Sequence, residues 1–240
     1  EEIGRETDKL NLALIQMALD RGGFGEVEIL GYGDGLSLEL YYFCGVILLF
    51  LLLSGLLNSA LFLHGNGAFS CFLKARGVGA FRQILGEYAA YLLLVLAGLF
   101  SLCLPLGFGL GRELLAIPEW EGMGAGPFFT FLPLFLPVAA MFAAMQLFLF
   151  EAAEGIVNGI LLQLICGIGM GYLSGYFYPS AFFPETMRAL GELLPSGAAA
   201  RFAQAGALGK IPAVSWAAVF GWLAAFLVLT ALVREWRIGK

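Results

Sequence analysis

The chain has 240 residues, of which 60% are hydrophobic and 13% are charged. A soluble domain carries about 25% charged residues, so this chain lacks the polar side chains that a surface in water needs, which excludes a soluble globular fold. The net charge of −5 and the lack of a basic patch exclude nucleic acid as a partner. The apolar residues fall in blocks of about 20, the length at which a helix crosses a bilayer. We therefore predict an all-α, polytopic membrane helix bundle that has the lipid bilayer as its solvent.

Residues 1–40 are polar and are expected to be the end of an extracytoplasmic segment. Because the sequence begins with Glu1 and no signal sequence precedes this stretch, we expect a fragment or a processed product. The transmembrane domain is predicted over residues 41–233, followed by a tail at 234–240. Its five predicted spans lie at about 41–63, 84–108, 128–150, 155–177 and 213–233. The third span is expected to tolerate Pro133 and Pro137 because neighbouring helices can satisfy the freed backbone groups.

Segment 178–212 is apolar but is interrupted by prolines and charged residues. We predict two short re-entrant or interfacial helices there rather than a sixth crossing. Five crossings place the chain ends on opposite sides of the membrane, and basic residues are enriched in cytoplasmic loops. The bases expected inside are Lys74, Arg76, Arg82, Arg234, Arg237 and Lys240, and those expected outside are Arg112, Arg188, Arg201 and Lys210. In a cell membrane, segment 65–83 and the C-terminus would then be cytoplasmic.

The fourth span carries small residues at every fourth position, with one glutamine in the series. The residues are Gly155, Gly159, Gln163, Gly167, Gly171 and Gly175. Small side chains at this spacing let two helix backbones approach closely. The pattern predicts a tightly packed face, against either a neighbouring span or another subunit.

Few polar groups lie within the predicted spans. The uncharged ones are Asn58, Gln146, Asn158 and Gln163, which we expect to form hydrogen bonds between helices or to line a path. Glu87 is the charged residue closest to a span centre, and it is expected to lie near one end, within reach of Arg82 or water. An ion-driven transporter is therefore disfavoured. The four cysteines, Cys44, Cys71, Cys103 and Cys166, are predicted to be buried small hydrophobic residues.

Residues that could carry out catalysis are scarce. The single histidine, His64, has no cysteine or acid at ligand spacing, so no metal site is predicted. Segment 206–210 ends in Gly-Lys but lacks the earlier glycine and the hydroxyl residue of a phosphate-binding loop. We predict that the chain is not an enzyme, has no catalytic residues and binds no cofactor itself.

Two segments resemble the permease subunits of type-2 ABC (ATP-binding cassette) exporters. The first, 72–91, reads FLKARGVGAFRQILGEYAAY and is similar to the cytoplasmic stretch in which a short helix leads into the next span. The second, 173–195, reads LSGYFYPSAFFPETMRALGELLP and is similar to the signature at the end of the family's fifth span. The residues that carry this second motif are Ser174, Gly175, Pro179, Pro184 and Pro195.

The resemblance implies that the five spans are numbers two to six of a six-span permease. It implies that segment 69–83 is a coupling element on a separate ATPase subunit, which binds and hydrolyses ATP, and that a second permease copy or homologue completes the transporter. The residues of this coupling loop would be Phe69, Phe72, Leu73, Lys74, Arg76, Phe81 and Arg82. Its apolar residues Phe72, Leu73 and Phe81 suit a groove, and its cations would set the register of the contact. The alternative is a membrane-surface helix attracted to anionic lipid.

The leading hypothesis is therefore the membrane-spanning permease subunit of an ABC exporter, which works by alternating access. The alternative is a membrane-anchored sensor or scaffold that transports nothing. A co-purifying ATPase would distinguish the two.

Overall fold

The computed structural model describes residues 38–58, 67–107, 132–153, 155–178, 180–209 and 211–238. Within these ranges every regular element is helical, which confirms the predicted all-α bundle. The α-helices are α2 (Leu38–Leu57), α3 (Gly67–Ala75), α4 (Ala80–Gly107), α7 (Phe135–Ala152), α8 (Ile156–Leu173), α9 (Glu185–Leu193), α10 (Pro195–Ala207) and α11 (Ala213–Ile238). Two short 3-10 helices, η3 (Leu132–Leu134) and η4 (Ser180–Phe182), precede α7 and α9. Of the predicted extracytoplasmic segment 1–40, residues 1–37 lie outside the described residues and residues 38–40 form the start of α2.

Five helices, α2, α4, α7, α8 and α11, are long and apolar enough to cross a membrane. Their apolar segments contain 18 to 25 residues, and at 1.5 Å per residue even the shortest is about 27 Å long. This length matches a hydrocarbon core of about 30 Å. With 9 and 13 residues, α9 and α10 are too short to cross. The prediction of five spans and two short helices is confirmed for the part of the chain that the structure describes.

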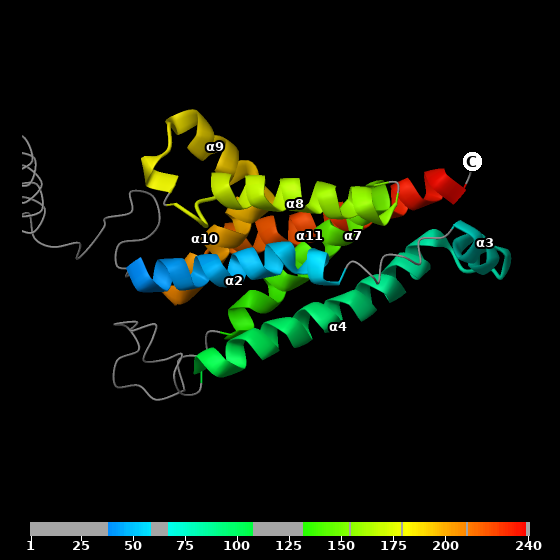
Figure 1. Cartoon of the computed structure of the whole chain (residues 1–240), viewed down its shortest axis with the longest axis horizontal. Helices are drawn as coiled ribbons and strands as arrows, with labels where there is room; N and C mark the ends of the chain where they lie inside the picture. The colour runs from blue at the N-terminus through cyan, green and yellow to red at the C-terminus, as the bar shows by residue number, and fades with distance from the viewer. Residues whose placement is uncertain are drawn as a thin grey trace, which may run out of the picture.

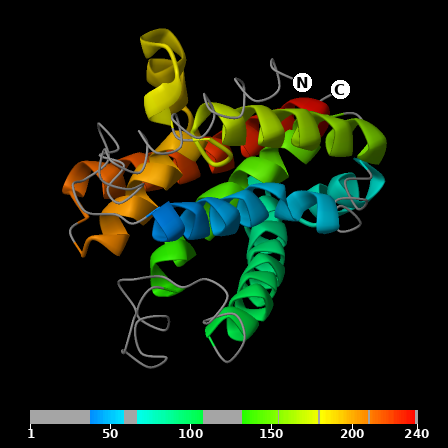
Figure 2. The ribbon, with the colours of Figure 1, turned by 60° about the vertical axis from the view of Figure 1, so that its left-hand side comes forward.

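The five long helices alternate in direction, so the bundle has two distinct ends (Figure 1). One end, here called the α3 end, holds α3, the turn between α7 and α8, and the C-terminal end of α11. The other, here called the α9 end, holds the start of α2 together with α9. Figures 1 and 2 both show α4 inclined to α2 and α8, so α4 forms one flank of the bundle.

The core is centred on α2 and α7. In each of these helices 61% of the apolar segment is buried, compared with 28% in α4, 22% in α8 and 17% in α11. Phe135, Phe142 and Met145 of α7 pack in the same cluster as Ile47 and Leu51 of α2. The outer faces of α4, α8 and α11 expose large apolar side chains, as a surface in contact with lipid requires. The arrangement is two buried central helices surrounded by three peripheral ones.

Several helix boundaries differ from the predicted span limits. Helix α4 begins at Ala80, so Arg82 lies in its first turn. Helix α11 continues to Ile238, so Arg234 and Arg237 lie on a helix rather than in a separate tail. Pro133 lies in η3 and Pro137 in the first turn of α7. A missing N–H at a helix start breaks no intrahelical bond, so these prolines need no compensation from neighbouring helices.

The cysteines do not share one environment. Cys44 and Cys103 are buried and Cys166 is partly buried, but Cys71 of α3 is exposed. The prediction of burial is therefore wrong for Cys71, because α3 projects beyond the spans instead of packing among them.

Candidate functional site

A closed corner joins α3 to α4. The N–H of Val78 donates to the carbonyl of Leu73 at 3.0 Å, and the N–H of Gly77 donates to the carbonyl of Lys74 at 2.9 Å. These two bonds form a Schellman motif, which requires a left-handed residue after the helix end. Gly77 has φ of +83°, which glycine adopts without steric cost. The side chain of Gln83 then donates to the Val78 carbonyl at 2.9 Å, so the corner is fixed from both helices.

The corner presents aromatic and basic side chains from α3 and from the first turn of α4. Phe72 is 53% exposed and Phe81 is 54% exposed. The Arg76 guanidinium lies 5.0 Å from the centre of the Phe72 ring, in a cation-π contact. Lys74 and Arg82 are exposed, and Leu73 is partly buried. The structure thus brings these predicted coupling residues to one corner, whereas the side chain of Phe69 lies outside the described residues.

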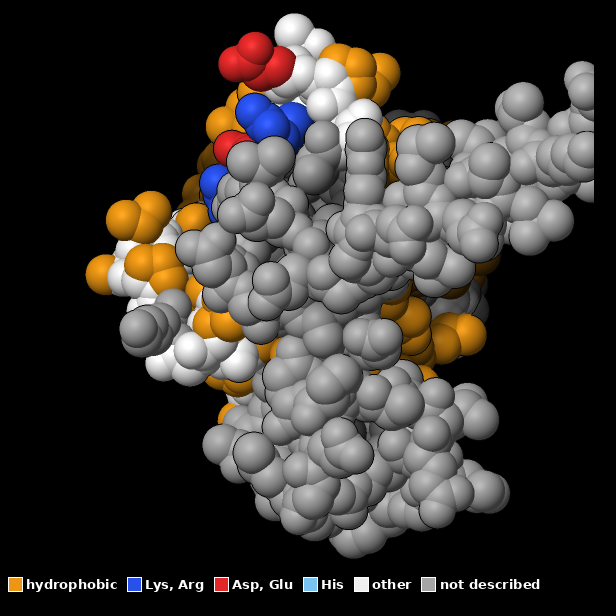
Figure 3. Space-filling view, turned by 90° about the vertical axis from the view of Figure 1, so that its left-hand side faces the viewer, with side chains coloured by type: hydrophobic (Ala, Val, Ile, Leu, Met, Phe, Trp, Pro, Cys, Tyr) orange, Lys and Arg blue, Asp and Glu red, His pale blue; other side chains and the backbone are white. Residues whose placement is uncertain are grey.

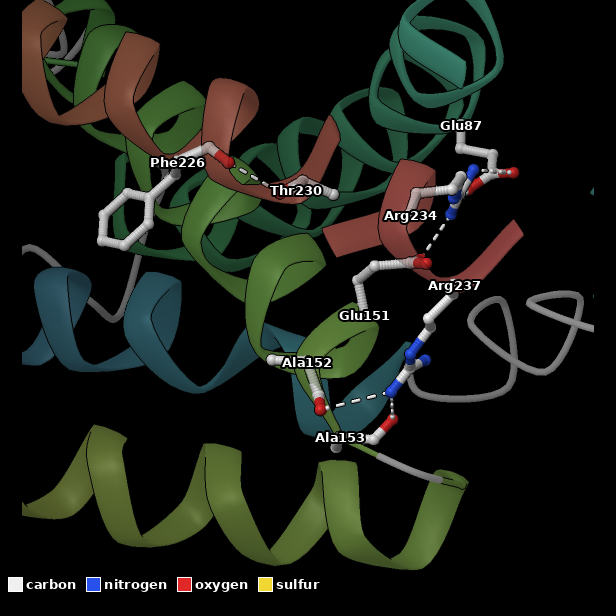
Figure 4. Close-up of polar contacts among 8 residues, drawn as sticks. All are labelled: Glu87, Glu151, Ala152, Ala153, Phe226, Thr230, Arg234 and Arg237. Carbon is white, nitrogen blue, oxygen red and sulfur yellow. Dashed lines mark hydrogen bonds and ion pairs between the residues drawn. The ribbon is translucent and has the colours of Figure 1, made fainter. Parts of the chain in front are cut away.

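An ion cluster joins α4, α7 and α11 near the same end (Figure 4). Arg234 of α11 donates two parallel hydrogen bonds to Glu87 of α4, from Nη1 to Oε1 and from Nη2 to Oε2, each 2.8 Å long. Its Nη2 also donates to Oε2 of Glu151 in α7 at 2.5 Å. The partner of Glu87 is therefore Arg234 rather than the predicted Arg82 or water alone. One cation between two carboxylates leaves a formal charge of −1.

The cluster is shielded from solvent to different degrees. The side chains of Arg234 and Glu151 are 4% and 10% exposed, whereas that of Glu87 is 40% exposed. A buried guanidinium is tolerated only when its donors are paired. One turn along α11, Arg237 donates to the carbonyls of Ala152 and Ala153 at 3.3 and 3.2 Å. A cation at the last carbonyls of α7 satisfies groups that the helix end leaves open, and α11 thereby binds the end of α7 twice.

A second polar layer lies deeper in the bundle, around Gln146 of α7, which is fully buried. Its Nε2 donates to the carbonyls of Leu51 and Leu52 in α2 at 2.7 and 2.9 Å. Its Oε1 accepts from the hydroxyls of Ser54 and Tyr91. Gln146 therefore connects α2, α4 and α7 through both ends of one amide. The predicted interhelical role of Gln146 corresponds to these contacts.

Gln163 and Asn58 behave differently from Gln146. The Nε2 of Gln163 in α8 donates to the Leu52 carbonyl at 2.6 Å, but its buried Oε1 has no hydrogen-bond partner among the described residues. Asn58 donates to the Ser54 carbonyl of its own helix at 3.2 Å. Gln163 thus links two neighbouring helices, and this bond of Asn58 stays within one helix.

The glycine series of α8 forms its buried face. The buried residues of this helix are Gly159, Gln163, Gly167 and Gly171. A Cβ built on Gly159 would meet the ring of Phe150 in α7, and one built on Gly167 would meet Leu53 in α2. Within this chain, the glycines therefore allow α8 to approach α7 and α2.

At the α9 end, the second family-like motif takes part in a cluster of hydrogen bonds among Tyr41, Ser174, Tyr176 and Ser196, here called the knot. The Ser174 and Ser196 hydroxyls are 2.6 Å apart, and the Tyr176 hydroxyl donates to the Ser196 carbonyl at 2.7 Å. Gly175, with φ of +84°, ends α8, and its carbonyl accepts from the Tyr41 hydroxyl of α2 at 2.6 Å. The knot thus ties α2, α8 and α10 together.

The prolines of this motif stand at helix starts. Pro184 is the residue before α9, and Pro195 is the first residue of α10, where its fixed φ suits a helix and its missing N–H is not needed. Pro179 lies outside the described residues. Figure 3 shows the described charged side chains of this end gathered over α9 and the neighbouring α10.

Sequence reasoning missed two close backbone approaches. A Cβ on Gly191 would collide with the Leu173 carbonyl, and one on Gly197 would collide with the Gly191 carbonyl. Both positions therefore require glycine. It also missed the pairing of Arg234 with Glu151, although each residue directly follows a predicted apolar span. In an alternating bundle those two span ends share one side, and this was the signal available.

Among the described residues, no group of three His, Cys, Asp or Glu side chains comes together as a metal site would need. No protein-family model, curated protein or solved structure matches this chain. The function is therefore argued from the geometry of the α3 corner, the ion cluster and the knot.

Proposed function

We propose that this chain is the membrane-spanning permease subunit of a type-2 ABC exporter, in which a separate ATPase subunit drives alternating access. The observation that carries the proposal is the α3 corner. The nine-residue helix α3 stands outside the five spans and presents Phe72 and Lys74, and the first turn of α4 adds Phe81 and Arg82 beside them.

The composition of the corner suits a protein partner. Residues 67–86 contain Lys74, Arg76 and Arg82 and no acid. The matching surface is a groove with an apolar floor for the rings and an acidic rim for the cations. The Schellman motif and Gln83 hold α3 at a fixed angle to α4, so a partner that moves α3 also moves the start of a span.

The distribution of charge along the spans supports the proposed energy source and orientation. Within the apolar segments of the five spans, the charged residues all belong to the α3 end, and Glu39 precedes the first of these segments. They are Arg82, Glu87, Glu151, Arg234, Glu235 and Arg237. A proton or sodium path would place ionisable groups at mid-membrane depth. The basic excess supports an orientation in which the α3 end and the C-terminus face the cytoplasm, where an ATPase would have access to ATP.

The α9 end fits the same proposal. Helices α9 and α10 connect the end of α8 to the start of α11, which both lie at the α9 end, and the knot holds α10 against α8. They correspond to the re-entrant extracellular helices that the resemblance implies. A second permease copy or homologue would complete the transporter.

The test is a pull-down of the full-length protein in mild detergent, with ATPase activity assayed in the eluate. The variants are Phe72→Asp and Arg76→Glu at the α3 corner. Their matched controls are Leu193→Asp, which replaces an exposed apolar residue at the α9 end, and Arg188→Glu in the same helix. We expect the two α3 variants to lose the ATPase while the controls retain it, and all four to elute from size exclusion like the wild type.

Two results would count against the proposal. Absence of any co-purifying ATPase with the wild-type protein would favour the membrane-anchored sensor or scaffold. Retention of the ATPase by both α3 variants would show that docking does not use this corner.

A further inference from the structure

The ion cluster of Glu87, Glu151 and Arg234 is placed between the α3 corner and the body of the bundle. Glu87 lies seven residues after the start of α4, about two turns from the corner. Arg234 and Glu151 belong to α11 and α7, which are the partners of α4 in the bundle interior. The cluster is thus the charged contact through which the corner end of α4 meets two other spans.

Apolar packing and the ion cluster constrain α4 in different ways. Ile84, Tyr88, Tyr91, Val95 and Leu99 form the buried stripe of α4. The hydroxyls of Tyr88 and Tyr91 donate to the Ala140 carbonyl and to Gln146 of α7, and the other side chains of the stripe make non-directional apolar contacts. A guanidinium that binds a carboxylate through two parallel bonds fixes both distance and angle.

We propose that Arg234 is the positioning residue through which a displacement of α3 and the start of α4 reaches α7 and α11. The inference rests on the proposed function, in which an ATPase moves α3. Its bidentate bond makes Glu87 and α11 move together, and its third bond adds α7 through Glu151. Helix α8 has no member in the cluster, so it provides a reference against which the movement can be measured.

The burial of the cluster makes this link hard to break during a cycle. Arg234 is 4% exposed and Glu151 is 10% exposed, whereas Glu87 is 40% exposed, so water has little access to the bond between Arg234 and Glu151 and reaches the cluster from the Glu87 side. Separating the guanidinium from the carboxylates would leave buried charges unpaired. The three helix ends are therefore expected to move as one body.

The experiment uses the full-length protein with its ATPase partner in lipid nanodiscs. Spin labels are attached to noncanonical amino acids that are introduced genetically at exposed positions. Double electron–electron resonance then measures two distances. The pair Leu85 and Val157 measures α4 against α8, and the pair Leu232 and Val157 measures α11 against α8. Each distance is compared without nucleotide and after trapping with ATP and vanadate.

The decisive variant is Glu87→Gln, which keeps the side-chain shape and removes the negative charge that accepts the two parallel hydrogen bonds of Arg234. The matched control is Glu235→Gln, which removes an exposed carboxylate one residue from Arg234. In the wild type and the control we expect trapping to shift both distances. In Glu87→Gln we expect the Leu85 shift to persist and the Leu232 shift to be lost, with the ATPase still bound. If Glu87→Gln does not fold, Glu87→Asp is used instead. It disrupts the same two hydrogen bonds by shortening the side chain, and it keeps the charge.

The outcomes separate this inference from the proposed function. An unchanged Leu232 shift in both Glu87 variants, with the ATPase bound, would overturn the role of Arg234 alone. The same conclusion would follow if the wild-type complex showed a Leu85 shift without a Leu232 shift. A wild-type protein that binds no ATPase would overturn the proposed function, and the inference would fall with it.

Discussion

Gln146 and Gln163 are both fully buried glutamines in membrane spans, yet their replacement by methionine is expected to have opposite effects. Methionine is unbranched and has about the length of glutamine, so it can replace Gln146 beside Gly55. This contact is close: a Cβ built on Gly55 would lie 3.2 Å from the Gln146 side chain. A hydropathy scale alone predicts that both substitutions stabilise the protein. The hydrogen bonds predict otherwise.

The magnitudes follow from the contacts that each amide makes. Gln146 makes four hydrogen bonds, to the carbonyls of Leu51 and Leu52 and to the hydroxyls of Ser54 and Tyr91. At about 0.6 kcal/mol for each bond in a membrane bundle, Gln146→Met lowers the free energy of unfolding by about 2 kcal/mol. Within the described part of the chain, Gln163 makes one such bond and its buried Oε1 has no partner. Since an unpaired buried acceptor costs about 1 kcal/mol or more, Gln163→Met leaves stability unchanged or raises it slightly.

The assay is unfolding of the purified protein by increasing dodecyl sulfate in a mild detergent, followed by circular dichroism. A double-mutant cycle with Tyr91→Phe isolates one of the four bonds. Gln146→Met should cost less in the Tyr91→Phe background, because the hydroxyl that lost its acceptor is then absent. Equal destabilisation by the two methionine variants, or stabilisation by Gln146→Met, would refute the reasoning that satisfied hydrogen bonds distinguish these glutamines.

Three further predictions concern the corner and the knot. Gly77→Ala should lower local stability by about 1 kcal/mol, because a φ of +83° is unfavourable for an L-residue even where the space around it is open. The control Gly79→Ala should have little effect. Hydrogen exchange over residues 67–83 should become faster in Gly77→Ala and not in Gly79→Ala. Gly197→Ala should destabilise by about 2 kcal/mol or more through collision with the Gly191 carbonyl, whereas Gly169→Ala, with open space, should be neutral or slightly stabilising in thermal unfolding; equal melting temperatures would contradict this. Tyr176→Phe should cost about 1 kcal/mol by removing the bond to the Ser196 carbonyl, and Tyr172→Phe, at an exposed ring, should cost nothing measurable in the same scan.

The spans could be predicted from the sequence because their signal is local. A run of about 20 apolar residues identifies a crossing without knowledge of its neighbours. The short helices α9 and α10 were equally accessible, since Pro184 and Pro195 stand immediately before or at helix starts. Charged residues at span ends were harder to assign. Arg234 continues the helix that its apolar run begins, because Glu87 and Glu151 satisfy its guanidinium there.

The contacts that hold the spans together could not be read from local pattern. Gly191 and Gly197 are glycines in a segment that contains others, and only the fold shows that a carbonyl lies where their Cβ would be. The four-residue spacing in α8 did predict a packed face, because this spacing can be recognised in a single sequence without knowledge of the fold. Which helix covers the face depends on the three-dimensional arrangement, and here it is α2 and α7.

Directional bonds divide the bundle into two groups of helices. At the α9 end, the knot of Tyr41, Ser174, Tyr176 and Ser196 ties α2, α8 and α10. At the α3 end, Arg234 ties α4, α7 and α11. The two groups meet in the polar layer around Gln146 between the two ends. A tilt of one group against the other about this layer would leave both end clusters intact. A rigid-body movement of this kind is what alternating access requires, so the placement of the bonds agrees with the proposed export cycle.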